Sequence, residues 1–205
     1  MGKCITRRSA VAMSPSETSS LSASNELAKP DPKDDDLAEF RKLISPYSAS
    51  PEQRSQHESC HAVRALLLGG VVEIVTLECC EVSGLRRIKD LLQYRIAGLC
   101  SEFLFEGRQK LSPDPDLYEV AINEVRWGET EHAHDLHNFF SLLLNVNPHL
   151  SDDELILRAD IEIAECEQTL RHPDYLAAIQ RCARALCSKG HLVSPEVCEL
   201  FMRDD

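Results

Sequence analysis

The sequence predicts a mainly α domain with one small β element. Six or seven segments after residue 36 carry apolar residues at helical spacing. Most of them are bounded by helix start or stop signals, such as a Ser cap followed by Pro, or a closing Gly. Only residues 71–77 form a short run of β-branched residues, as a strand does.

The composition narrows the function classes. A hydrophobic fraction of 43% is enough for a core, and the net charge of −12 argues against a nucleic-acid binder, which needs a basic surface. The longest apolar runs, such as residues 65–68, are too short to span a bilayer, so we expect no transmembrane segment. The nine cysteines include no CxxC pair, which indicates reduced thiols packed as small hydrophobic groups.

The chain is expected to divide into a tail, residues 1–36, and a folded domain, residues 37–205. Residues 14–24 are rich in Ser, and residues 29–36 alternate Pro with charged side chains. Such segments bury too little apolar surface to offset the entropy of ordering, so the tail is predicted to be disordered. A short helix is expected from near Leu37 to before Pro46.

The first strong helix is predicted from Pro51 to about Leu68. Ser50 and Gln53 form a capping box around Pro51, and Gly69 with Gly70 ends the helix. Residues 71–77 follow as a strand, and residues 78–84 are expected to turn back or pair with it.

A long helix is predicted over residues 85–106, with Gly107 as its C-cap. The Pro-rich loop 112–116 opens another helix that reaches about Trp127, where Gly128 breaks it. The next helix can be capped by Thr130 and ends at Pro148; its apolar stripe follows i, i+3, i+4, i+7, i+8 spacing and consists of Leu136, Phe139, Phe140, Leu143 and Leu144.

Three helices are predicted to complete the domain. A second capping box, Ser151 with Glu154, opens a helix to about Leu170. The next carries an apolar stripe over residues 175–186 and closes at Gly190, and Ser194 begins a last short helix.

The motif that carries chemistry is HExxH, from His57 to His61. Residues i and i+4 share one helix face, so the imidazoles of His57 and His61 can both reach one zinc ion. Glu58 lies beside that face and can accept a proton from a water that zinc makes acidic. These residue types at this spacing indicate a Zn²⁺ site with Glu58 as general base.

A catalytic zinc site needs a third protein ligand. No His lies between His61 and His132, which excludes the pattern with a third His soon after the motif. The candidates are Glu102 on the 85–106 helix and, on the helix after Thr130, the group His132, His134, Asp135 and His137. Glu102 also fits an outer role, that of a carboxylate orienting a zinc-bound imidazole.

The order of motifs resembles the protease domain of FtsH-type zinc metallopeptidases over roughly residues 50–202. The resemblance rests on HExxH followed by Ala62, an apolar run and two glycines; on Ala97, Gly98, Glu102 and residues 105–107; on Gly128, Glu129 and Thr130 before Asp135 and Leu136; and on the ending over residues 175–201.

The resemblance implies a compact helical zinc-metallopeptidase domain with Asp135 as the third ligand. Asp135 also borders the apolar stripe of its helix, so it can face inward. The chain departs from the family in having Ser59 and Cys60 inside the motif, where Ala and Gly are usual. His134 stands where the family has Asn, and it could compete as a ligand or serve next to the metal.

No phosphate-binding loop of the GxxxxGK[ST] type occurs, so we expect the single chain to act without ATP. The expected activity is hydrolysis of peptide bonds in a peptide or unfolded protein, with a partner ATPase or a homo-oligomer as the assemblies to consider. Residues 71–77 are expected to offer an edge to an extended substrate. The rivals are a peptidase-like binding or scaffold module that keeps the zinc, and a helical interaction protein without metal.

The N-terminal sequence is compatible with more than one cellular compartment. We expect a cytoplasmic protein, but Gly2 and Thr6 fit the myristoylation pattern, and Cys4 could be palmitoylated, which would anchor the chain to a membrane. The same stretch is basic and Ser-rich, without an acidic residue before Glu17, and so also resembles an organelle-targeting peptide.

Overall fold

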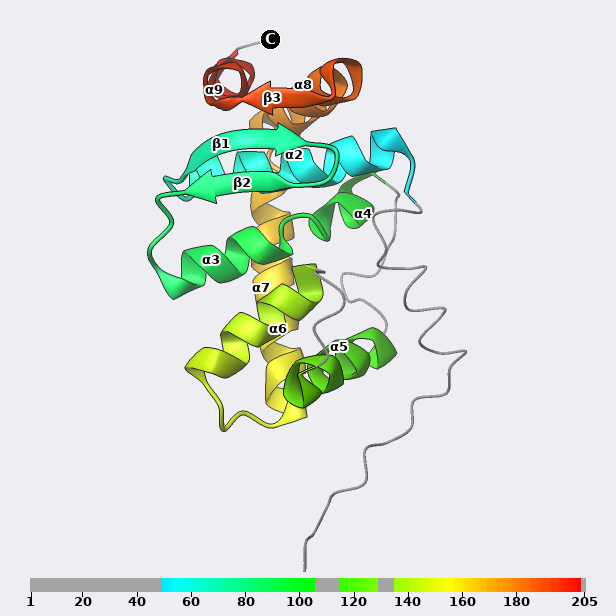
Figure 1. Ribbon diagram of the computed structural model, residues 1–205, viewed down its shortest axis with the longest axis vertical. Helices are drawn as coiled ribbons and strands as arrows, with labels where there is room; N and C mark the ends of the chain where they lie inside the picture. The colour runs from blue at the N-terminus through cyan, green and yellow to red at the C-terminus, as the bar shows by residue number, and fades with distance from the viewer. Residues whose placement is uncertain (1–48, 106–114, 129–134, 204–205) are drawn as a thin grey trace, which may run out of the picture. The chain divides into compact units, whose positions relative to one another are not determined.

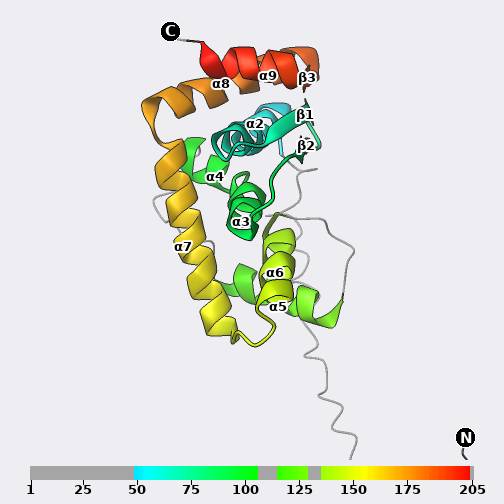
Figure 2. The same ribbon diagram turned by 90° about the vertical axis from the view of Figure 1, so that its left-hand side faces the viewer.

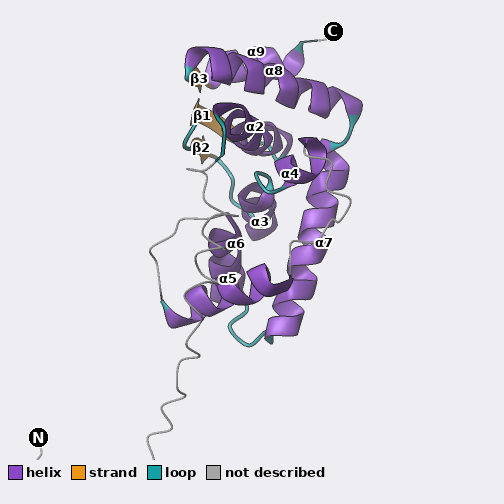
Figure 3. Ribbon diagram, turned by 90° about the vertical axis from the view of Figure 1, so that its right-hand side faces the viewer, coloured by secondary structure: helices purple, strands orange, loops and turns teal. Residues whose placement is uncertain are grey.

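The computed structural model describes residues 49–105, 115–128 and 135–203 and confirms the mainly α class (Figures 1 and 3). The expected short helix near Leu37, the boundary between residues 36 and 37, and the Thr130 cap lie outside these residues. None of the described helices combines the length and the apolar character that crossing a bilayer requires.

Helix α2, Pro51–Leu67, begins as predicted. The Ser50 side chain accepts a hydrogen bond from the Gln53 main chain (3.2 Å), and the Gln53 side chain accepts one from the Ser50 main chain (2.9 Å). These bonds satisfy main-chain donors that the first turn leaves unpaired. The helix ends before Gly69, whose positive φ of 79° turns the chain into the sheet.

The sheet has three antiparallel strands in the order β2-β1-β3: β1, Val71–Thr76; β2, Cys80–Ser83; and β3, His191–Val193. The expected pairing of residues 78–84 with the first strand is therefore confirmed. The strand β3 was not predicted, because three residues between two helices are too short to give a pattern. It pairs with β1 through Ile74, Val75 and Thr76.

The expectation that residues 71–77 offer a free edge is wrong. The strand β1 lies in the centre of the sheet, because β3 returns from the far end of the chain and takes its second side. The outer edges of the sheet belong to β2 and β3.

The predicted continuous helix over residues 85–106 is also wrong. The structure has two helices, α3, Ile88–Ile96, and α4, Cys100–Phe105, separated by a turn at Ala97, Gly98 and Leu99. Both helices contribute to the same core, so their apolar residues share one side although the helix is interrupted. The interruption falls at Gly98.

The remaining helices lie close to the predicted positions: α5, Pro115–Trp127; α6, Asp135–Val146; α7, Asp152–Leu170; α8, Pro173–Lys189; and α9, Ser194–Met202. The Ser151–Glu154 capping box opens α7, and Gly190, in the left-handed conformation, closes α8.

Two clusters of buried apolar residues hold these elements together. The larger cluster joins α2 to α3, α4, α5, α6, α7 and α8. The helix α7 runs along α3, α4 and α5 (Figure 2). The smaller cluster joins the sheet to α2, α8 and α9, with Val72, Val75 and Leu192 facing Ala62 and Ala65 of α2. Because α2 belongs to both clusters, it is fixed from opposite sides.

We expect Ser50→Ala to lower the free energy of unfolding by about 0.5–2 kcal/mol, because Ala cannot accept the Gln53 main-chain hydrogen bond. Urea unfolding followed by circular dichroism would measure the change. Ser50→Asp keeps an acceptor and serves as the control, so it should retain most of the stability. Equal loss in both variants would contradict the capping role.

Candidate metal centre

The helix α2 presents three of the predicted site residues. His57 and His61 lie one turn apart with ring centroids 5.0 Å from each other. Glu58 is buried, with 6% of its surface exposed. The side chain of His61 is 6% exposed and that of His57 is 29% exposed, so the site is open to solvent on the His57 side.

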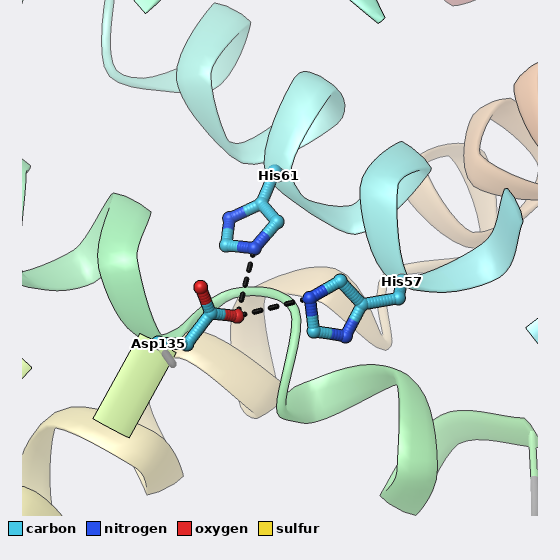
Figure 4. Close-up of side chains that lie close together, drawn as sticks. All are labelled: His57, His61 and Asp135. Atoms are coloured by element: carbon cyan, nitrogen blue, oxygen red, sulfur yellow. Dashed lines mark hydrogen bonds and ion pairs between the residues drawn. The ribbon is translucent and has the colours of Figure 1, made fainter. Parts of the chain in front are cut away.

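The third group comes from the start of α6. The Asp135 Oδ2 atom lies 2.9 Å from His61 Nε2 and 3.0 Å from His57 Nε2 (Figure 4). One donor atom from each of the three residues lies within 4.8 Å of the others. This geometry could hold a metal ion, and within the described residues no other group of His, Cys, Asp or Glu does so.

His61 faces Asp135 with Nε2 and the Tyr94 carbonyl with Nδ1. The hydrogen bond at Nδ1 determines whether Nε2 carries a proton or a lone pair. His61 Nδ1 lies 2.8 Å from the main-chain oxygen of Tyr94, and a carbonyl can only accept, so Nδ1 carries the proton. In a neutral imidazole, Nε2 then has a lone pair directed at the Asp135 carboxylate. Two lone pairs at 2.9 Å repel each other unless a proton or a metal cation lies between them. The donor set therefore fits a cation.

The charges of the site support the same conclusion. Burial alone would raise the pKa of the Asp135 carboxyl, but His61 and His57 together hold that pKa well below its usual range. Burial alone would lower the pKa of His61, but the charge of Asp135 and their hydrogen bond raise it to about 9. Without a metal the imidazole thus retains a proton, which occupies the position that a cation would take.

Glu58 has the opposite shift. Burial raises the pKa of its carboxyl above the ordinary value, and this effect is only partly offset by His61 and His57. A carboxylate with a raised pKa is a better proton acceptor near neutral pH than an exposed one.

The predicted helix over residues 85–106 is broken at Gly98, where the main chain passes against His57 and Asp135. A Cβ atom at this position would lie 2.4 Å from His57 Nε2 and 2.5 Å from Asp135 Oδ2. The main chain between α3 and α4 therefore passes directly against the donor atoms of His57 and Asp135, and only Gly leaves room for them.

The other sequence candidates have different positions. His132 and His134 lie outside the described residues. His137 Nδ1 lies 3.9 Å from the carboxylate of Glu124 on α5. Glu102 lies on α4 and is not part of the donor group. The outer hydrogen bond to His61 comes from the Tyr94 carbonyl, while an outer role for Glu102 stays a prediction.

Sequence reasoning missed the contribution of Tyr94 to the site. Its hydroxyl also donates to the main-chain oxygen of Cys80, so one residue connects β2 to a candidate ligand. Every residue has a carbonyl group, so no residue type could have indicated this one.

Comparison of the chain with protein-family models and with curated proteins finds no match. The case for a metal centre therefore rests on the residues and their geometry.

We expect Asp135→Ala to weaken zinc binding far more than Glu102→Ala, because it removes a donor atom from the group. Loss of an outer carboxylate would cost about 10–100-fold in affinity. Chelator competition at one pH would measure both variants. The opposite order of the two affinities would make Glu102 the third ligand.

We expect Gly98→Ala to abolish most of the zinc binding predicted for this site, because its methyl group would displace His57 or Asp135. The control is Gly190→Ala, which has no atom within 4 Å of the added Cβ but keeps a positive φ of 79°. That control should lose about 1–2 kcal/mol of stability from backbone strain alone and keep its zinc. Full zinc content in purified Gly98→Ala would contradict the close approach.

Proposed function

We propose that this chain is a zinc-dependent metalloendopeptidase of the FtsH type. The observation that carries the proposal is the convergence of His57, His61 and Asp135, with Glu58 on the same helix as the two histidines. Two imidazole nitrogens and one carboxylate oxygen are ligands that zinc accepts, and a three-residue set leaves a fourth position open.

Bound zinc supplies the Lewis acidity that polarises a carbonyl and acidifies water. The protein supplies the remaining steps. Glu58 accepts the proton of the attacking water, and its partial desolvation tunes it for that role. The same carboxyl group, once protonated, can return the proton to the leaving amine. The exposed side of His57 gives the substrate access.

The outer edge of β2 is the feature that suits an extended substrate. It is not paired with another strand in the described part of the chain. The Tyr94 hydroxyl holds the Cys80 carbonyl of β2, and the Tyr94 carbonyl holds His61. A peptide that adds to this edge as a strand would therefore lie beside the donor group. A peptide or an unfolded protein fits this mode, because its main chain is free to pair.

Two departures from the FtsH pattern, Ser59 and Cys60, lie inside the motif. Ser59 and Cys60 are both fully buried, and Cys60 belongs to the larger core cluster. With these two residues in the motif, the donor atoms of His57 and His61 still lie close to that of Asp135. The departures are therefore compatible with the proposed chemistry.

We expect Glu58→Gln to keep zinc and fold but to lose about 10²–10⁴-fold in peptide hydrolysis, because an amide cannot accept the proton of water. The measurements are metal content by mass spectrometry and cleavage of a labelled unstructured polypeptide. Glu52→Gln, an exposed change on the same helix, is the matched control and should behave as the unmodified protein.

Equal activity of Glu58→Gln and the unmodified protein would remove Glu58 from the mechanism. Zinc binding without cleavage in any of the proteins, over many unstructured substrates, would favour the binding or scaffold module instead. Absence of zinc from the unmodified protein would favour a helical interaction protein.

A further inference from the structure

We propose that Gln93 is a positioning residue for the metal centre. Its buried side chain fixes the segment that carries the Tyr94 carbonyl, and this carbonyl orients His61. The inference rests on the metal centre of the proposed function but not on peptide hydrolysis.

The Tyr94 carbonyl must be held in place to orient an imidazole. It lies near the end of α3, where it accepts hydrogen bonds from the Ala97 main chain (3.2 Å) and from His61 Nδ1 (2.8 Å). Carbonyl groups in the last turn of a helix lack some of the partners that interior carbonyls have. The position of this carbonyl therefore depends on what holds the residues next to it.

Gln93 directly precedes Tyr94 and is held by groups from two other helices. Its amide oxygen accepts from Arg64 Nη2 of α2 (2.6 Å). Its amide nitrogen donates to the main-chain oxygen of Glu162 on α7 (3.1 Å) and to the Glu162 carboxylate. The Cys166 thiol, one turn further along α7, donates to the main-chain oxygen of Gln93 at 3.7 Å. Only 1% of Gln93 is exposed, so water cannot replace these bonds.

The bonds close a ring between α2 and α3. Arg64 lies three residues after His61, and so on the same side of α2 one turn later. Two hydrogen bonds close this ring of contacts: one joins His61 to the Tyr94 carbonyl, and the other joins Arg64 to the Gln93 side chain. A slide of α3 along α2 would break both bonds. Glu162 and Cys166 fix the ring to α7, and Arg158 balances the charge of Glu162 (2.5 Å).

Stability alone does not account for this network. Arg64 is 6% exposed, and its Nε has no hydrogen-bond partner among the described residues. Replacing buried charged groups by apolar residues of similar volume is often neutral or stabilising. Among the residues that the structure describes, this network leaves one hydrogen-bond donor without a partner, but it joins three helices next to the candidate ligand His61. It is therefore suited to fixing the orientation of the His61 imidazole.

The test follows the Nδ1 proton of His61 in the full chain labelled with ¹⁵N-histidine, with and without zinc. This proton donates to the Tyr94 carbonyl whether Nε2 holds a proton or a metal, so it should exchange slowly with water in both states. Its signal is assigned by its absence in His61→Gln. Rapid exchange in the unmodified protein would overturn the proposal.

Gln93→Met keeps the length of the side chain and removes its hydrogen bonds. We expect faster exchange of the His61 proton and zinc affinity, from chelator competition, lowered by about 10–100-fold. The matched control is Glu167→Gln, which weakens the ion pair between the buried Glu167 of α7 and the exposed Arg171, and should change neither quantity. Unchanged exchange in Gln93→Met, or an equal change in Glu167→Gln, would overturn the proposal.

If Gln93→Met does not fold, Arg64→Met tests the same ring by removing the donor to the Gln93 oxygen. It should accelerate the exchange of the His61 proton, and unchanged exchange would overturn the proposal. The proton signal also distinguishes failure of the proposed function from failure of the role assigned to Gln93. Loss of zinc binding in the unmodified protein contradicts the proposed function, whereas unchanged proton exchange in the variants contradicts only the role of Gln93.

Discussion

The approach of Asp135 to two imidazoles is the interaction on which the site depends. Its Oδ2 atom lies within 3.0 Å of both Nε2 atoms, although α6 and α2 are separated by more than sixty residues in sequence. Such an arrangement needs a positive charge at its centre, because the Tyr94 carbonyl directs the lone pair of His61 toward the carboxylate. The helices α2, α3 and α6 must therefore be held at fixed distances, and the larger core joins all three.

The placement of α2 shows how the fold meets this requirement. It packs against the sheet and α8 on one side and against α3 and α4 on the other. Its capping box fixes where it begins, and Gly69 fixes where it ends. A helix restrained in this manner can hold two histidines in a defined direction, which a surface helix would do less well.

The sequence allowed the local features to be predicted and left the non-local ones open. Capping boxes at Ser50 and Ser151 indicate helix starts, because the cap involves residues only three apart. The break at Gly98 could not be predicted from helical periodicity, and the approach of its main chain to His57 and Asp135 is a non-local contact. The strand β3 depends on pairing with β1, more than a hundred residues earlier in the chain.

The same distinction applies to the site. HExxH places two donors by spacing alone, and the structure brings Asp135 to them. The Tyr94 carbonyl is a main-chain group, and Gln93 has no property in the sequence that separates it from the other glutamines. Their roles arise only from the packing of α3 against α2 and α7.

The unequal exposure of the two histidines has a consequence for metal exchange. His57 has 29% of its side chain in contact with solvent, whereas His61 has 6% and is tethered through Nδ1. An ion that bound this group from solvent would therefore approach on the His57 side. A chelator would reach such an ion from the same side, while the hydrogen bond through Nδ1 keeps His61 in place.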